Sequence, residues 1–253
     1  MNITRTAAYW SAVFLVFGVY LINTESALAQ SAPGWGAIWQ QRMTIGQAQL
    51  DSAFKLAESG KVNEALAMID QVIATDPKNW RSYFLKSAVL VLAKRGSEAL
   101  KQIDTSINLA RKSNVSAGLL AELYESKARS CMDYGRDGEA KKSLEQAVRL
   151  QPSDPATLND LAWMLATAKD SRVRDGRRAV AIATKACHLS DWKNAFSVDT
   201  LAAASAAAGD FADAVKYQQL AISLLGPDDR KAQLPGMQER LHQYSVGQIF
   251  TGI

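Results

Sequence analysis

The chain has 253 residues, of which 48% are hydrophobic and 21% charged, a balance that is typical of globular proteins and excludes an intrinsically disordered chain. The formal net charge of +4 at pH 7 is mild, and acidic and basic residues are interleaved along most of the sequence, so we expect no nucleic-acid partner. Alanine-rich runs such as residues 201–208 favour closely packed helices, and we predict an all-α fold.

Residues 1–29 are predicted to form a secretory signal peptide. Arg5 precedes an apolar stretch at residues 7–22, and the small-residue triplet Ala27-Leu28-Ala29 follows it. The apolar stretch is shorter than the roughly 20 residues that span a bilayer as a helix. We therefore expect cleavage after Ala29, a periplasmic or extracellular chain and no stable membrane span, with an uncleaved N-terminal membrane anchor as the alternative.

Residues 30–45 are interpreted as a linker and an N-terminal cap. The segment opens with serine, proline and glycine and then carries Trp35 and Trp39 beside a helical pattern. Large aromatic side chains can cover the open hydrophobic end of a stack of helices. The alternative is that the two tryptophans contact a partner or a membrane surface.

From residue 46 onward, a glycine, an alanine and a proline recur in fixed order and spacing. Such a triplet is typical of a helical hairpin, because glycine closes the first helix in a left-handed conformation and proline stops the second. The alanine lies where the two helix backbones cross closely. The glycines lie 75 and 74 residues apart, which is two units of about 34 residues plus a short insertion, so we predict a degenerate unit in each gap. The three triplets are Gly60, Ala65 and Pro77; Gly135, Ala140 and Pro152; and Gly209, Ala214 and Pro227, the last proline one place late.

This pattern resembles the tetratricopeptide repeat, a solenoid of paired helices that binds other proteins. The wording N-x-L-A-W-x-L-A-T at residues 159–167, then Asp175-Gly176, then A-V-x-x-A-T-x-A-C at residues 179–187 looks like a recurring bacterial subfamily of that repeat. The resemblance covers roughly residues 46–245. It implies a right-handed superhelical solenoid of antiparallel helix pairs with a C-terminal capping helix, and together with the signal peptide it suggests a bacterial envelope protein.

We place the solenoid at residues 46–233 and the capping helix and tail at residues 234–253. The second unit is degenerate, with Lys94 where glycine is expected and Gly96 nearby, and polar residues 111–120 form an insertion after it. Arg240, Leu241 and Tyr244 match the usual end of related repeats, although residues 247–253 replace the basic and aromatic residues that usually follow. The five repeats are expected at about residues 46–79, 80–113, 121–154, 155–194 and 195–228.

Catalytic and metal-binding patterns are absent from the sequence. The two histidines, His188 and His242, lie far apart and outside any metal-binding motif, so we expect no metal, no cofactor and no enzymatic activity. Cys131 and Cys187 could form one disulfide in an oxidising compartment, but both fall on apolar helix stripes, which favours buried thiols. We therefore predict a non-enzymatic scaffold, or alternatively an accessory subunit that positions an envelope enzyme or a secretion or cell-wall assembly machine.

Two groups of residues are candidates for contacting a protein or peptide partner. Stacked hairpins place the first helix of each repeat along a concave groove, so exposed residues on those helices are groove candidates. An arginine cluster on the insertion at residues 169–176 could make a weak contact with an anionic partner, and the alternative is a solvated loop. The alternative for Phe54, Phe84 and Trp163 is packing between helices. The groove candidates are Phe54, Arg81, Phe84, Glu122, Arg129, Asn159, Trp163 and Asp199, and the loop candidates are Arg172, Arg174, Arg177 and Arg178.

Overall fold

The computed structural model describes residues 35–252, with side chains from Gly46 onward except that of Asp228. Within this range the secondary structure consists of eleven α-helices, α2 to α12, and no strand, which confirms the predicted all-α class. The predicted signal peptide and residues 30–34 of the linker lie outside the described residues, as do the side chains of Trp35 and Trp39. None of the helices in residues 35–252 has both the length and the apolar character needed to cross a bilayer.

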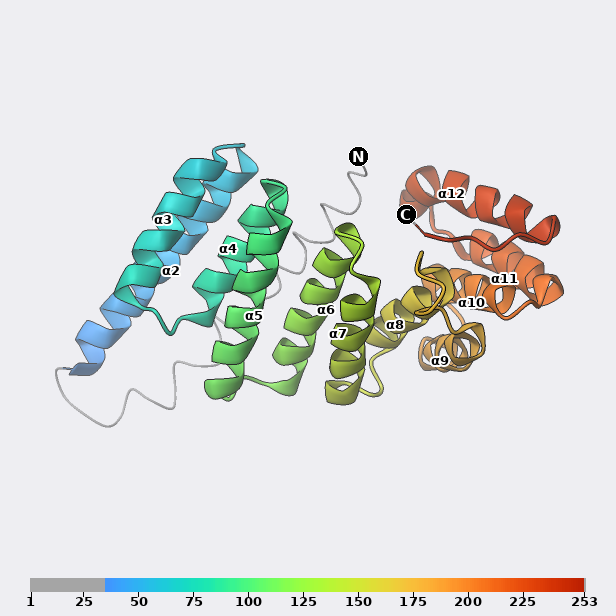
Figure 1. Ribbon diagram of the computed structural model, residues 1–253, viewed down its shortest axis with the longest axis horizontal. Helices are drawn as coiled ribbons and strands as arrows, with labels where there is room; N and C mark the ends of the chain where they lie inside the picture. The colour runs from blue at the N-terminus through green and yellow to red at the C-terminus, as the bar shows by residue number, and fades with distance from the viewer. Residues whose placement is uncertain (1–34, 253) are drawn as a thin grey trace. The chain divides into compact units, whose positions relative to one another are not determined.

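The chain divides into two compact units, one ending at Ser130 and the other beginning at Cys131, so the boundary falls inside one helix. In the first unit, α2 packs against α3 and α4 packs against α5, and α4 also contacts α2 and α3 (Figure 1). The helices of this unit are α2 (Trp35–Glu58), α3 (Val62–Thr75), α4 (Trp80–Leu92), α5 (Gly96–Lys112) and α6 (Ala117–Asp133), which crosses the boundary.

The second unit is built in the same way from adjacent helices. α8 packs against α7, α9 and α10, and α10 also packs against α9 and α11. The last helix, α12, lies against α11 and also contacts α10. The helices of the second unit are α7 (Asp137–Leu150), α8 (Pro155–Thr167), α9 (Gly176–Leu189), α10 (Ala195–Ala207), α11 (Phe211–Leu224) and α12 (Pro227–Ser245).

Four hairpins close with the same left-handed turn. Gly60, Gly135 and Gly209 have φ values of 84°, 69° and 90°, as their positions in the sequence predict. In the degenerate second repeat, Lys94 takes the place of the glycine with φ 58°, whereas Gly96 begins α5. In each turn the next residue donates its N–H to a carbonyl five residues back, and Arg95 does so to Leu90 over 2.9 Å. This is the hydrogen bond of a Schellman motif, and it satisfies a carbonyl that the helix end leaves open.

The alanine of each predicted triplet is fully buried, as expected where two helices approach closely. Ala65, Ala140 and Ala214 each have 0% of their surface exposed. Ala99 and Ala179 are buried at the equivalent places of the second and fourth repeats. A larger side chain at these positions would push the paired helices apart, because protein interiors are close-packed.

One sequence-based boundary, the start of the capping helix, is wrong. Pro77 and Pro152 follow the ends of α3 and α7, but Pro227 begins α12, so the capping helix starts seven residues before the predicted residue 234. Proline is well suited to the first turn of a helix, where its missing N–H has no intrahelical partner to lose. The predicted insertion at residues 111–120 contains the connection between α5, which extends to Lys112, and α6, which starts at Ala117.

Candidate functional site

The groove candidates of the first unit differ in accessibility. Phe54 and Arg81 are half-buried, and the Arg81 guanidinium lies 4.8 Å from the centroid of the Trp80 ring. Phe84 is fully buried with 0% exposure, so the expectation that it faces a partner is wrong and its packing alternative is correct. The physical reason is that α4 has three neighbouring helices, α2, α3 and α5, which cover most of its circumference.

Charged groove candidates lie together on α6. Glu122 and Arg129 are seven residues apart, which places them on one face of the helix, and both are half-buried. Arg129 forms an ion pair with Glu125, with 3.6 Å between Nη2 and Oε2, while its Nε is buried and has no acceptor among the described residues. Burial raises the pKa of Glu122, and the charge of Arg129 opposes this rise. This face of α6 therefore carries partly buried charges whose hydrogen bonding is incomplete.

Asp199, a groove candidate on α10, is buried under the capping helix instead. Only 5% of the residue is exposed, and Arg240 of α12 pairs with both carboxylate oxygens, with Nε–Oδ1 at 3.0 Å and Nη2–Oδ2 at 2.8 Å. Gln218 of α11 donates a third hydrogen bond to Oδ1 over 2.7 Å. Burial raises the pKa of Asp199, whereas Arg240 and Gln218 oppose that rise. The expectation that Asp199 contacts a partner is wrong, because its carboxylate already accepts hydrogen bonds from α11 and α12 and so links α10 to both helices.

The Arg240 guanidinium also lies between two aromatic rings. Its Cζ atom is 5.4 Å from the ring centroids of both Trp163 on α8 and Phe250, and the two ring centroids are 5.8 Å apart. Phe250 belongs to residues 246–252, which follow α12 and which we call the tail. The tail reaches α8, because the Gly252 N–H donates to the carbonyl oxygen of Thr167 over 2.7 Å.

A half-buried face of α8 carries the remaining candidates of the second unit. Asn159, Trp163 and Thr167 follow one another at intervals of four residues, so they share one face of the helix. The Oδ1 atom of Asn159 is buried and has no hydrogen-bond donor among the described residues. We call these three residues together with Arg240 the α8 surface. The surface unites the predicted candidates Asn159 and Trp163 with Thr167 and Arg240, and Phe250 of the tail lies against it. Thr167, Arg240 and Phe250 are not among the predicted candidates.

A sequence signal for these missed residues was present. Arg240 and Tyr244 match the ending of related repeats, and Phe250 is the one aromatic residue among residues 246–253. What the sequence could not supply was the reversal of the chain after α12, which begins at Gly247 with φ 72°.

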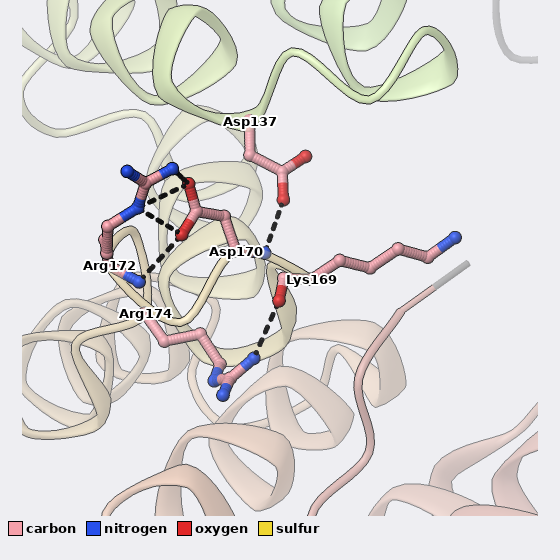
Figure 2. Close-up of polar contacts among 5 residues, drawn as sticks. All are labelled: Asp137, Lys169, Asp170, Arg172 and Arg174. Carbon is pink, nitrogen blue, oxygen red and sulfur yellow. Dashed lines mark hydrogen bonds and ion pairs between the residues drawn. The ribbon is translucent and has the colours of Figure 1, made fainter.

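The loop between α8 and α9 is held mainly by its own polar contacts. Figure 2 shows the Arg172 guanidinium against the Asp170 carboxylate, with 2.8 Å between Nη2 and Oδ2. The Asp170 N–H donates to Asp137 at the start of α7, and Arg174 donates to the carbonyl oxygens of Ala168 and Lys169. The pairing with Arg172 lowers the pKa of the Asp170 carboxyl.

The other two loop arginines also lie near carboxylates. Arg178 donates to Glu145 of α7 over 2.8 Å between Nη1 and Oε1. Arg177 lines an open pocket of about 240 Å³ together with Asp210 and Asp213 at the N-terminus of α11. Carboxylates and carbonyl oxygens of the chain itself lie near these four arginines, as expected for a solvated loop. The contact with an anionic partner remains a prediction.

The Asp-Gly pair that ends this loop is explained by two different contacts. Asp175 caps α9 by accepting the Arg178 N–H over 3.0 Å, and its own N–H donates to the Leu165 carbonyl over 2.9 Å. Gly176, the first residue of α9, packs directly on the backbone of Ala207 and Ala208 at the end of α10. The pair therefore fixes where α9 begins in the helical hairpin formed by α8 and α9.

The cysteines and acidic residues add no second site within the described chain. Both cysteine side chains are buried, as predicted, and burial raises the pKa of the Cys187 thiol to about 11. No group of three or more histidine, cysteine or carboxylate side chains in residues 46–252 is arranged to hold a metal ion.

Comparison with known proteins identifies the repeat. The sequence model of the tetratricopeptide repeat matches residues 121–154, the same residues at which the third repeat was predicted. No curated protein matches the sequence.

Several solved structures share the fold. The chain is similar to YrrB, described as a TPR protein with an unusual peptide-binding site, with 16% identity, a TM-score of 0.56, and 75% of this chain and 90% of that chain covered. For the MamA protein the identity is 17%, the TM-score 0.56 and the coverage 74% and 94%. For a Podosopora anserina putative kinesin light chain with nearly identical TPR-like repeats, the values are 20%, 0.58, 70% and 93%. The chain thus contains a tetratricopeptide repeat at residues 121–154 and shares the paired-helix fold of TPR proteins, a fold that typically serves as a non-enzymatic scaffold for protein or peptide partners.

Proposed function

We propose that this protein is a non-enzymatic interaction scaffold of the bacterial cell envelope. It binds a partner protein or peptide through the groove that the first helices of its repeats are predicted to line. The observation that carries this proposal is the α8 surface, where Trp163 and Asn159 lie half-buried on one helix face and the Asn159 amide oxygen has no hydrogen-bond donor among the described residues. An aromatic ring supplies apolar contact area, and an asparagine amide forms hydrogen bonds with a peptide backbone, which is the combination that a peptide requires.

The charged face of α6 supports the same reading. The unpaired Nε of the partly buried Arg129 can donate a hydrogen bond to a partner, and the neighbouring Glu122 carboxylate can accept one. The peptide-binding site named for YrrB is an additional argument, since the two chains share a fold.

The envelope location rests on the pattern of residues 1–29. We expect the mature protein to begin at Gln30 and to be recovered from the periplasmic or extracellular fraction. Cell fractionation with N-terminal sequencing measures both properties. A protein that keeps its first 29 residues and remains in the membrane fraction would support the alternative of an N-terminal anchor.

The binding function is tested by affinity capture from a native envelope extract. The bait is the chain from Gln30, compared with an Arg129→Ala, Trp163→Ala double variant whose helicity is verified by circular dichroism. The matched control is Leu220→Ala, which removes an exposed apolar side chain from the second helix of a repeat. We expect the partner to be retained by the wild-type chain and the control and lost from the double variant.

Equal capture by all three baits would contradict binding through the first-helix face. The identity of the captured protein distinguishes a general interaction scaffold from an accessory subunit. An envelope enzyme or a component of a secretion or cell-wall machine would make this chain an accessory subunit.

A further inference from the structure

We propose that the α8 surface is a binding site for an extended peptide that carries an aromatic side chain, and that the chain's own tail occupies this site as an internal ligand. The inference rests on the proposed scaffold function and deepens it, because it names the subsite and the chemistry of the partner. A partner must displace residues 246–252 in order to bind.

The aromatic part of the site is built before any ligand arrives. Arg240 is only 13% exposed in its side chain, and its two hydrogen bonds to Asp199 fix the plane of the guanidinium. Trp163 forms one wall at 5.4 Å from the Arg240 Cζ atom, and the Phe250 ring lies at the same distance. An aromatic ring in this place gains contact with both a cation and a second ring. Any partner ring of similar size fits the same chemistry.

The backbone part of the site is the open end of α8. Thr167 is the last residue of that helix, so its carbonyl oxygen has no intrahelical donor. The tail satisfies it through the Gly252 N–H, two residues after the aromatic residue. A Cβ atom at Gly252 would lie 3.2 Å from the Thr167 hydroxyl oxygen, which favours a small residue at this position. The site therefore selects an aromatic residue, any residue and then a small residue.

The tail is attached in a way that permits displacement. Figure 1 shows it turning back beside α12, and up to Gln248 its backbone N–H groups bond to the last turn of that helix. Beyond Gln248, the described residues hold the tail through the ring contacts of Phe250 and the hydrogen bond of Gly252. The side chains of Val246 and Ile249 are 55% and 38% exposed. A segment with so few buried contacts opens locally at low cost.

A tethered ligand competes strongly, because its effective concentration is of the order of millimolar for a short linker. The affinity of a peptide for the wild-type chain is therefore lowered by the fraction of molecules whose tail is bound. Emptying the site should raise the apparent affinity of the same peptide without adding any contact to it.

The test uses fluorescence anisotropy with a labelled peptide of residues 245–252, S-V-G-Q-I-F-T-G, as the probe. It is titrated with the wild-type chain from Gln30 and with the Phe250→Ala chain. We expect the Phe250→Ala chain to bind at least tenfold more tightly. Ile249→Ala is the matched control, because it shortens an exposed neighbour of Phe250 and should leave the affinity as in the wild-type chain.

Two further arms secure the interpretation. A Gly252→Pro chain, which lacks the N–H donated to Thr167 but keeps every core residue, should also bind the probe more tightly than the wild-type chain. A probe with alanine in place of its phenylalanine should not bind to the Phe250→Ala chain.

Equal probe affinity for the wild-type, Phe250→Ala and Gly252→Pro chains would overturn the inference. The proposed scaffold function would then still stand or fall on the capture experiment, since that experiment compares α6 and α8 variants in the presence of the intact tail.

Discussion

Replacing Gly176 by alanine should destabilise the second unit, although alanine is the better helix former. A Cβ atom at this position would lie 2.4 Å from the carbonyl carbon of Ala207 and 2.4 Å from the amide nitrogen of Ala208. Both atoms are backbone, so no side-chain rotation relieves the overlap, and α9 and α10 must separate by about 1 Å to reach ordinary contact at 3.4 Å. Overpacking costs about 1–3 kcal/mol. Helix propensity returns at most about 1 kcal/mol.

Because rigid backbone is involved, the overpacking cost should lie near the upper end of its range, at about 3 kcal/mol, and the gain in helix propensity leaves a net loss of about 2 kcal/mol of unfolding free energy. At about 2–4 °C per kcal/mol for a chain of this size, the Tm falls by about 4–8 °C. Thermal and urea unfolding followed by circular dichroism measure both quantities. Gly138→Ala is the matched control, because it lies in the first turn of α7 with nothing within 4 Å of the new Cβ, and it should be neutral or stabilising. A Gly176→Ala protein as stable as Gly138→Ala would refute the close-approach argument.

Three further predictions concern the turns, the buried ion pair and the thiols. Lys94→Gly should stabilise the chain by about 1 kcal/mol, because a left-handed residue with a side chain costs about 1–2 kcal/mol, and Gly135→Ala should shift the urea midpoint in the opposite direction. Asp199→Ala should lower the unfolding free energy by about 3–5 kcal/mol, because it leaves a buried arginine without its carboxylate, and an unchanged urea midpoint would show that the pair contributes nothing. Burial keeps the Cys187 thiol protonated below its pKa of about 11, so at pH 8 a thiol reagent should modify Cys187 and the equally buried Cys131 slowly in the native chain and rapidly in urea.

The repeats could be located from the sequence because each hairpin leaves a local signature. A left-handed residue between two helices favours glycine, and a close helix crossing favours alanine, and both demands fall on single positions. Gly60 and Ala65 therefore mark the first hairpin, and Gly135 and Ala140 mark the third, whose bounds also match the family. Lys94 shows the limit of this signature, since the same turn forms around a lysine when the flanking helices hold it.

The periodicity of one helix does not say how many neighbours that helix has. The register of α4 predicts an exposed face for Phe84, but three helices surround α4 and bury the ring. Register also predicts an exposed face for Asp199, whereas the capping helix brings Arg240 over it from 41 residues away.

Local sequence patterns suffice to predict the helical class, the hairpin turns and the buried alanines, because those properties depend on backbone conformation and spacing within about 34 residues. Only the tertiary structure decided which polar side chains remain accessible and where the tail lies. The contact of Phe250 with Trp163 joins residues 87 positions apart through a chain reversal at Gly247. Such a contact depends on the combined packing of α8, α10 and α12, which no local pattern encodes.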